Sequence, residues 1–142
     1  MSPRWKPDPD VRRGRSVVHS LHAHLVFTTK YRRAVFTDEL LRACEESMSK
    51  VCSDAGAELA EFNGEDDHVH LLVQYPPQVQ LSILVNSLKG VSSRVLRRDH
   101  PDEIRRLLWG DHLWSPSYFA GSCGGAPLSI VQDYIEGQKR PS

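Results

Sequence analysis

Hydrophobic and polar positions alternate along residues 17–29 (VVHSLHAHLVFTT), and this segment is rich in β-branched side chains. Alternation with a period of two predicts a β-strand, because successive side chains of a strand point to opposite faces. One predicted face carries Leu21, Ala23, Leu25 and Phe27, and the other carries Ser20, His22, His24 and Val26. The strand therefore has one apolar face for a core and one face rich in histidine.

In the other segments, apolar residues recur with a period of either two or about 3.6 residues, and this period distinguishes strands from helices. The opening Thr37-Asp38-Glu39 is a helix N-cap followed by acidic residues in the first turn. The predicted elements are helices over 37–54 and 80–98, strands over 57–62, 68–75 and 117–122, a turn at Asn63-Gly64, an irregular segment over 99–116 and a final helix near 127–138.

These elements follow the order strand, helix, strand, strand, helix, strand, helix. The first six match a split βαββαβ unit. We therefore predict an α+β, ferredoxin-like sandwich, in which an antiparallel sheet carries two helices on one face. The seventh element, the C-terminal helix, has no place in that sandwich within its own subunit and is expected to pack elsewhere.

The chain has 142 residues, which predicts a single domain. Prolines and an excess of basic side chains in residues 1–16 predict a flexible basic arm ahead of one domain over 17–142. Lys+Arg and Asp+Glu both number 18, so the net charge is zero. That balance argues against a protein that coats DNA in general, and it leaves room for local basic patches.

The chain has three cysteines, Cys44, Cys52 and Cys123, with none of the close spacings of a metal or redox motif. Their odd number and wide spacing predict neither a disulfide framework nor a zinc knuckle, which favours a reducing compartment. No apolar run reaches the ~18 residues that a membrane helix needs, and the polar, proline-rich start shows no signal peptide. A cytoplasmic protein with no membrane partner is expected.

Two histidines two residues apart, His68 and His70, lie in the predicted strand over 68–75. Their side chains project from the same face, where two imidazoles can converge on one metal ion. The same spacing occurs at His22 and His24, so spacing alone also allows half-exposed strand histidines. If the two strands are neighbours, all four histidines share the open face, and His24 is expected to orient a ligand without being one.

Tyr134 and Gln138 are four residues apart in the predicted C-terminal helix, so they share one of its faces. A tyrosine there could attack a phosphorus atom, and the glutamine could offer an amide oxygen to a metal. The spacing equally fits an ordinary surface tyrosine and a glutamine at a fraying helix end.

Several motifs occur in a fixed order along residues 17–138. They are Lys30-Tyr31-Arg32-Arg33, Asp67-His68-Val69-His70-Leu71-Leu72, Leu88-Lys89-Gly90-Val91-Ser92-Ser93-Arg94, Leu113-Trp114-Ser115-Pro116-Ser117-Tyr118, Gly124-Gly125-Ala126-Pro127-Leu128 and Tyr134-Ile135-Glu136-Gly137-Gln138. Each motif is weak alone. The ordered set resembles the single-tyrosine HUH transposases of bacterial insertion sequences, of the two-hundred/six-oh-five type (transposase A family).

The resemblance implies that His68, His70 and Gln138 bind Mg²⁺ or Mn²⁺ and that Tyr134 is the nucleophile. It implies cleavage and rejoining of single-stranded DNA at the ends of an insertion sequence, through a 5′-phosphotyrosine and with recognition of terminal hairpins. It also implies a homodimer with composite active sites, acting in the bacterial cytoplasm in association with the nucleoid. Gly137 lies between Tyr134 and Gln138, where a helix favours a better helix-forming residue, and this puts the placement of Gln138 in doubt.

Basic side chains next to these motifs are candidates for DNA contacts, although each is also compatible with a solvated surface. The candidates for phosphate contacts are Lys30, Arg32, Arg33, Lys89, Arg94 and Arg97. Tyr31 is expected to stack on a base. Asp66 and Asp67 are expected to cap the preceding turn and not to bind metal.

Two other functions are compatible with the sequence. A domesticated relative would process repeated genomic hairpins without mobilising itself. A non-catalytic nucleic-acid-binding domain with the same sandwich would normally carry exposed aromatic residues on its sheet. The histidines on the predicted open face disfavour this second alternative.

Overall fold

The computed structural model describes residues 21–108, 110, 112–122 and 134–137, and the backbone alone of residues 12–13 and 18–19. Its main sheet has four strands in the order β4-β5-β3-β6, and every neighbouring pair is antiparallel. The strands are β3 (Leu21–Thr28), β4 (Glu58–Gly64), β5 (His68–Tyr75) and β6 (Phe119–Ser122), and the helices are α1 (Asp38–Asp54), α2 (Leu81–Asp99), α3 (Pro101–Leu107) and the 3-10 turn η1 (Lys30–Arg32).

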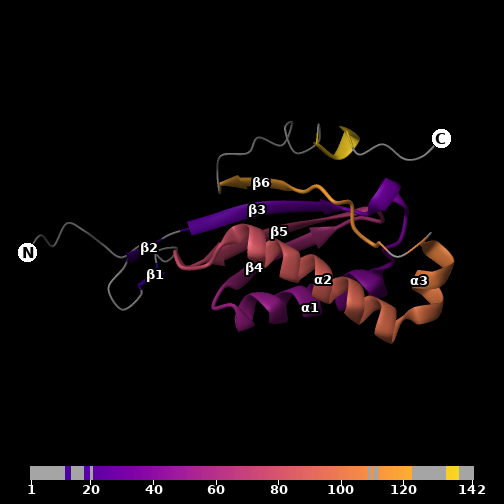
Figure 1. The fold of residues 1–142 in the computed structure, drawn as a ribbon, viewed down its shortest axis with the longest axis horizontal. Helices are drawn as coiled ribbons and strands as arrows, with labels where there is room; N and C mark the ends of the chain where they lie inside the picture. The colour runs from indigo at the N-terminus through magenta and orange to yellow at the C-terminus, as the bar shows by residue number, and fades with distance from the viewer. Residues whose placement is uncertain are drawn as a thin grey trace, which may run out of the picture.

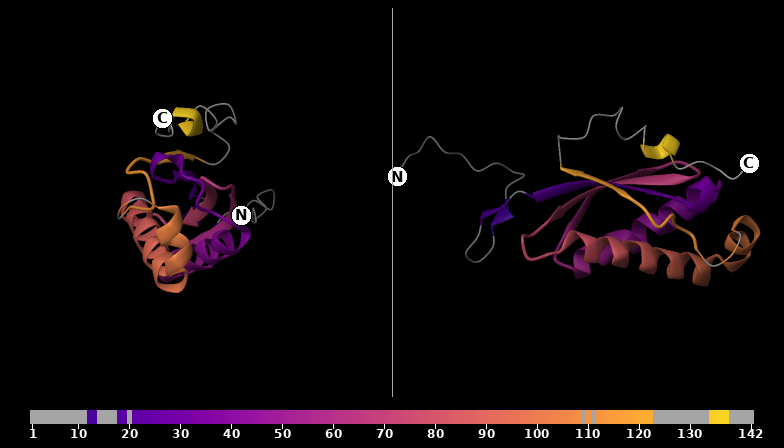
Figure 2. Two further views of the ribbon diagram at one scale, coloured as in Figure 1. Left: turned by 90° about the vertical axis from the view of Figure 1, so that its right-hand side faces the viewer. Right: turned by 45° about the horizontal axis from the view of Figure 1, so that its top comes forward.

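The molecule has two main layers. Helices α1 and α2 cover one face of the sheet, and the short helix over residues 134–137 lies on the other face, near β6 (Figures 1 and 2). The predicted ferredoxin-like α+β sandwich is therefore confirmed in its strand order, its antiparallel pairing and its helix layer. None of the helices in the described ranges has the length and hydropathy needed to cross a membrane.

The core lies between the sheet and the helix layer. Leu25 lies opposite Leu71 and Phe27 lies opposite Val69 in the register of β3 and β5, and all four are almost completely buried. Their partners from the helices include Leu40, Met48 and Leu88. The alternating apolar face predicted for residues 17–29 thus forms the floor of the core.

Helix α1 begins where the sequence predicts. The Thr37 hydroxyl accepts a hydrogen bond from the Leu40 amide at 3.2 Å, and Asp38 and Glu39 lie in the first turn. A capping hydroxyl satisfies an amide that has no partner inside the helix. This fixes the start of the helix just after the turn that follows β3.

The predicted turn at Asn63-Gly64 is wrong, because both residues belong to β4 and the chain reverses over residues 65–67. The Glu65 amide donates to the His68 carbonyl at 2.9 Å across this reversal. A side chain at Gly64 would have its Cβ 2.6 Å from the Leu41 Cδ2. The glycine therefore serves the close approach of α1 and not a turn.

The segment predicted to be irregular over 99–116 contains helix α3. Pro101 occupies its first turn, Asp102 and Glu103 follow, and Arg105 and Arg106 lie in its last turn. Proline and acidic residues favour a helix start, and basic residues favour a helix end. Ile104 alone among these residues is buried, so the helix has too short an apolar stripe to be read from periodicity.

Two other predictions fall partly outside the described residues. Within the arm predicted over 1–16, Arg12–Arg13 forms β1, which pairs antiparallel with β2 (Val18–His19). The rest of that arm is not described, and its boundary with the domain stays a prediction. Of the helix predicted near 127–138, the described part is helical over residues 134–137.

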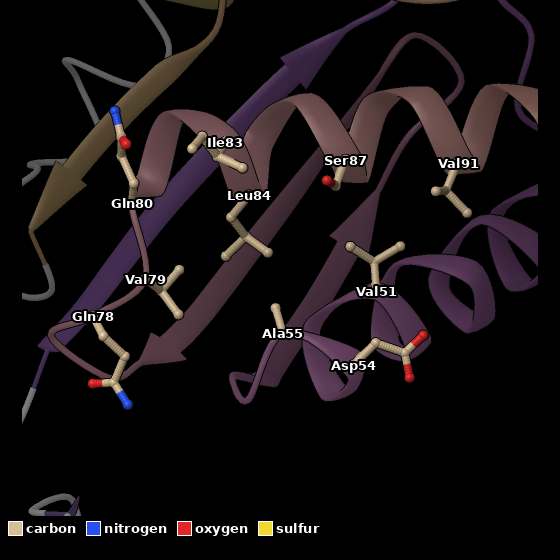
Figure 3. A pocket seen from close by; sticks show the side chains of 10 residues that line it. All are labelled: Val51, Asp54, Ala55, Gln78, Val79, Gln80, Ile83, Leu84, Ser87 and Val91. Atoms are coloured by element: carbon tan, nitrogen blue, oxygen red, sulfur yellow. The ribbon is translucent and has the colours of Figure 1, made fainter.

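An open pocket of about 550 Å³ lies between α1, α2 and the loop that precedes α2 (Figure 3). Val51, Ala55, Val79 and Leu84 contribute apolar side chains to it, and Ile83 is 59% exposed at its rim. The pocket belongs to the helix layer. It lies away from the sheet face that carries the predicted chemistry.

Candidate active site

Three histidines share the face of the sheet that α1 and α2 leave uncovered. In the register of β3 and β5, Thr28 lies opposite His68, and His24 lies opposite Leu72, two residues beyond His70. Paired residues in neighbouring strands point to the same face, and alternate residues of one strand do so as well. His24, His68 and His70 therefore project together, as the alternation predicts.

The rings of these histidines are in contact. The centroids of His68 and His70 are 4.9 Å apart, and those of His24 and His70 are 5.6 Å apart. His70 Nδ1 lies 3.5 Å from His24 Nε2. His22 lies farther along β3, opposite Gln74. The structure thus groups His24 with the predicted ligand pair and leaves His22 at the end of the row.

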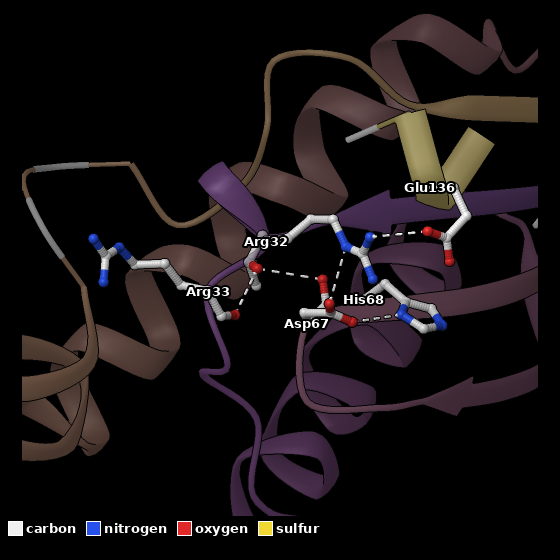
Figure 4. A network of polar contacts seen from close by, with 6 residues as sticks. Arg32, Arg33, Asp67, His68 and Glu136 are labelled. Atoms are coloured by element: carbon white, nitrogen blue, oxygen red, sulfur yellow. Dashed lines mark hydrogen bonds and ion pairs between the residues drawn. The ribbon is translucent and has the colours of Figure 1, made fainter. Parts of the chain in front are cut away.

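A buried carboxylate holds the His68 ring (Figure 4). Asp67 Oδ1 lies 2.8 Å from His68 Nδ1, and Asp67 Oδ2 lies 3.1 Å from Arg32 Nε. Asp67 is only 2% exposed. An ionised carboxylate only accepts hydrogen bonds, so His68 Nδ1 carries the proton and donates. In the neutral tautomer with this proton, Nε2 carries the lone pair that a ligand would use.

His70 is neutral at neutral pH. Burial first, and then the neighbouring His68 and His24, lower the pKa of His70 from 6.5 to about 4. A metal ion binds the unprotonated imidazole. The site therefore presents a second lone pair without having to release a proton.

These donors fit a divalent cation. Two imidazoles lie side by side, and one of them is oriented by a carboxylate in the manner typical of metal-binding histidines. The Thr28 hydroxyl, on the same face, is buried and has no hydrogen-bond partner among the described residues. A buried hydroxyl of this kind normally meets a water or a ligand. The third predicted ligand, Gln138, lies outside the described residues.

A second group of possible ligand atoms overlaps this site. Glu65, Asp67 and His68 have ligand atoms that all lie within 4.8 Å of one another. The oxygens of Asp67 already face His68 Nδ1 and Arg32 Nε, which favours a role in orienting these side chains over direct metal binding. The prediction that it only caps a turn missed this role, although its backbone carbonyl does accept from the Thr29 amide at 2.9 Å.

Tyr134 lies on the same open face as the histidines. Its ring centroid is 6.0 Å from that of Phe119, and its hydroxyl is 3.0 Å from Ser117 Oγ. Phe119 is also 6.3 Å from His24, so it stands between the tyrosine and the histidines. Within the described residues, no hydrogen bond or ring contact joins Tyr134 to His68 or His70.

The expectation that the C-terminal helix has no place on its own sandwich is wrong for residues 134–137. Ile135 is 8% exposed and packs on Val26, which is completely buried. Val26 is an apolar residue on the histidine face of β3, so this face needs an apolar cover of its own. The helix residues provide that cover.

Lys89 supports the segment that holds the tyrosine. Its ammonium group donates to the carbonyl oxygens of Ser115 at 2.8 Å and Ser117 at 2.9 Å, and it lies 5.4 Å from the ring centroids of Phe27 and Tyr118. Burial lowers the pKa of Lys89 from 10.5 to about 8. The predicted phosphate ligand is thus bound to backbone carbonyls.

The basic turn after β3 divides into two parts. Tyr31 is 48% exposed with Lys30 Nζ 5.4 Å from its ring centroid, which leaves both available to DNA. The Arg32 side chain is only 18% exposed and is turned inward to Asp67. Arg33 is partly buried, and its carbonyl accepts from the Thr29 hydroxyl at 2.7 Å.

The remaining predicted DNA contacts, Arg94 and Arg97, lie on α2 in the helix layer. The structure does not bring them to the histidine face. Asp67, Ser117 and Phe119 are the neighbours of the site that the sequence reading did not assign to it. A carboxylate directly before a strand histidine was the available signal for Asp67.

Fold, site and sequence define a class of protein. The family model described as "Transposase IS200 like" matches residues 17–138. The chain therefore belongs to the family of IS200-like transposases, the enzymes of transposition in insertion sequences.

Individual relatives with similar sequences are also transposases. The ISDra2 transposase TnpA of Deinococcus radiodurans is 32% identical over 129 residues, which cover 91% of each chain. The transposase for insertion sequence element IS200 of Salmonella typhimurium is 32% identical over 115 residues, covering 81% of this chain and 74% of that protein.

Solved structures show the same fold. The crystal structure of a candidate transposase from Deinococcus radiodurans R1 superposes with a TM-score of 0.81 at 32% identity, covering 92% of this chain and 99% of the other. A REP-associated tyrosine transposase bound to a REP hairpin has a TM-score of 0.57 at 12% identity, covering 89% of this chain and 67% of the other. The second likeness concerns the fold alone.

Proposed function

We propose that this transposase cleaves and rejoins single-stranded DNA at the ends of an insertion sequence, with Tyr134 as the nucleophile. The observation that carries the proposal is the shared face. His68 and His70, with their rings 4.9 Å apart, and Tyr134 all lie on the side of the sheet that the helices leave open. A strand of DNA laid on this face would meet both the ligand pair and the hydroxyl.

The histidine pair would hold the scissile phosphate through a divalent cation, with His68 Nε2, His70 and Gln138 as its protein ligands. Such an ion, Mg²⁺ or Mn²⁺, withdraws charge from the phosphate when bound. Imidazole ligands favour Mn²⁺ in chemical terms. Asp67 fixes the His68 ring, and the lowered pKa of His70 keeps its imidazole free of a proton.

The tyrosine then performs the transfer. The Tyr134 hydroxyl gives up its hydrogen bond with Ser117 Oγ and loses its proton. Its oxygen then forms a bond to phosphorus, and the bond from phosphorus to the 3′ oxygen breaks. The 3′ oxygen takes up a proton and becomes a free 3′-OH, while the 5′ phosphate stays on Tyr134. Attack by a 3′-OH on this phosphotyrosine reverses the exchange, so rejoining needs no outside source of energy.

We further propose that two chains form a homodimer with composite sites, in which Tyr134 of one chain serves the histidines of its partner. The described contacts of the Tyr134 hydroxyl lead to Ser117 and not to its own histidine pair. The ion pair from Glu136 of this helix to Arg32 spans 3.9 Å and Glu136 is 79% exposed, so this contact adds little to the apolar packing of Ile135.

Cleavage is tested with a labelled single-stranded hairpin, Mn²⁺ and a denaturing gel. We expect a slower protein–DNA band that disappears in Tyr134→Phe and persists in the matched control Tyr118→Phe, whose ring packs against Phe27. A band that persists in Tyr134→Phe removes the nucleophile assignment. Equal cleavage of a duplex of the same sequence contradicts the substrate.

The composite site is tested by mixing two inactive variants, Tyr134→Phe and His68→Ala, co-expressed with different tags so that mixed dimers can be purified. One site of a mixed dimer then combines intact histidines with an intact tyrosine from the other chain. Restored cleavage supports sharing between chains. A mixed dimer as inactive as its parents shows that each chain uses its own tyrosine.

A further inference from the structure

We propose that Arg32 is a positioning residue of the histidine centre, which it acts on through Asp67, and that it is not a phosphate ligand. This inference rests on the proposed function only in taking His68 as a metal ligand. The sequence reading grouped Arg32 with three other residues of a basic turn as contacts to DNA. Its surroundings in the structure indicate a different role.

Three side chains form a continuous chain of polar contacts (Figure 4). Arg32 Nε lies 3.1 Å from Asp67 Oδ2, and Asp67 Oδ1 lies 2.8 Å from His68 Nδ1. The Arg32, Asp67 and His68 side chains are 18%, 3% and 8% exposed. Oδ2 thus faces Arg32 while Oδ1 faces His68, so Arg32 helps to fix the plane in which Asp67 presents Oδ1 to the imidazole.

Burial makes this contact necessary. A carboxylate that is shielded from water is stable only when it is paired and hydrogen-bonded. Arg32 supplies a cation at 3.1 Å from Asp67 Oδ2. Without it, the carboxylate would turn toward solvent, and the His68 ring would lose the partner that sets its orientation and its tautomer.

The backbone is shaped to deliver Arg32 to this place. Tyr31 and Arg32 both adopt left-handed conformations, with φ of 61° and 52°. Non-glycine residues adopt this region at a cost in energy, so two in succession require support from their surroundings. The turn directs Tyr31 outward, where it is 48% exposed, and Arg32 inward to the carboxylate.

That support comes from hydrogen bonds between the turn and the loop before β5. The Thr29 amide donates to the Asp67 carbonyl at 2.9 Å, and the amides of Val35 and Phe36 donate to the Asp66 carbonyl at 2.8 and 2.9 Å. These backbone hydrogen bonds tie the two loops together and restrict their relative movement. This rigidity is what a residue that positions a ligand requires, whereas a phosphate contact needs an exposed, adaptable side chain.

The first measurement uses the metal-free protein. Long-range ¹H–¹⁵N spectra of the imidazoles report which ring nitrogen carries the proton. We expect His68 to be protonated at Nδ1 in the wild type and to become a mixture of tautomers in Arg32→Ala. The matched control is Arg42→Ala, which removes an exposed arginine from α1.

The second measurement is the affinity for Mn²⁺ by calorimetry. Loss of a group that orients a ligand typically weakens metal binding by about 10–100-fold, and we expect a loss of that size in Arg32→Ala and none in Arg42→Ala. Arg32→Lys should fall between them, because an ammonium keeps the charge but not the planar geometry. Glu136→Gln should bind Mn²⁺ as the wild type does, since Glu136 contacts Arg32 from the exposed side.

The outcomes separate this proposal from the proposed function. If His68→Ala binds Mn²⁺ as tightly as the wild type, the metal centre itself is wrong. If His68→Ala loses binding while a folded Arg32→Ala keeps both its Mn²⁺ affinity and its tautomer, only the role of Arg32 is overturned. Weaker binding of the hairpin with unchanged Mn²⁺ affinity would return Arg32 to the phosphate contacts. Should Arg32→Ala fail to fold by circular dichroism, Arg32→Lys carries the same comparison.

Discussion

Protonation of His70 is expected to destabilise the metal-free protein as the pH falls from 6.5 toward 4. Burial and the neighbouring histidines lower the pKa of His70 from 6.5 to about 4 in the folded state. In the unfolded chain this imidazole takes up a proton below pH 6.5. Across this range the unfolded state binds more protons, so acid shifts the equilibrium toward it. The stability is present above pH 6.5 and is lost as the pH falls through the folded pKa.

The size of the effect follows from the same two values. A tenfold change in proton affinity corresponds to about 1.4 kcal/mol, so the difference from 6.5 to about 4 has an upper limit of about 3.4 kcal/mol. The His70 side chain is only partly buried, and screening by solvent reduces the expected contribution to about 1–2 kcal/mol. A change of this size is measurable in a small domain.

The assay is urea unfolding of the metal-free protein at a series of pH values between 7 and 4. Carboxylates also titrate in this range, so the informative quantity is the difference between the wild type and His70→Gln. The variant should lose about 1–2 kcal/mol less stability over the range than the wild type. His112→Gln, at an exposed histidine, is the matched control. Parallel curves for His70→Gln and the wild type would refute the argument.

Three other predictions concern the supports of the site. Lys89→Met should lower the free energy of unfolding by about 1–2 kcal/mol, because the Ser115 and Ser117 carbonyls lose a charged donor. It should also slow adduct formation in the gel assay, and unchanged cleavage would show that this clamp does not serve Tyr134. Gly64→Ala should cost about 1–3 kcal/mol in urea unfolding, because its Cβ would lie 2.6 Å from the Leu41 Cδ2. Removal of divalent cations by a chelator should abolish cleavage while circular dichroism stays the same, and cleavage that survives chelation would contradict the metal-dependent mechanism.

Most elements of the fold were predicted from local sequence patterns. The β5 strand was predicted at its observed bounds, because the alternation of histidine and apolar side chains over residues 68–75 matches the two faces of one strand. The start of α1 was predicted from Thr37, since a capping hydroxyl acts on an amide only three residues away. Such signals are local, so they can be read without knowing the tertiary structure.

The predictions that proved wrong concern segments whose conformation depends on packing against a part of the chain that is distant in sequence. Asn63-Gly64 has the composition of a turn, but its glycine is needed where Leu41 of α1 approaches β4. Helix α3 buries Ile104 alone among its residues, so periodicity had almost nothing to detect. In both cases packing against another element decided the local conformation.

The sequence by itself determined which residues could do chemistry on one face, because alternation along a strand sets the side of each side chain. The shared face of the histidine pair was accessible in this way, whereas the role of Tyr134 and the family were predicted from the resemblance of the ordered motifs. Only the tertiary structure decided what each group touches. Arg32 and Asp67 are 35 positions apart, and Lys89 reaches the Ser117 carbonyl across 28 positions. Contacts of this kind depend on the register of neighbouring strands and on the path of loops, which no local pattern specifies.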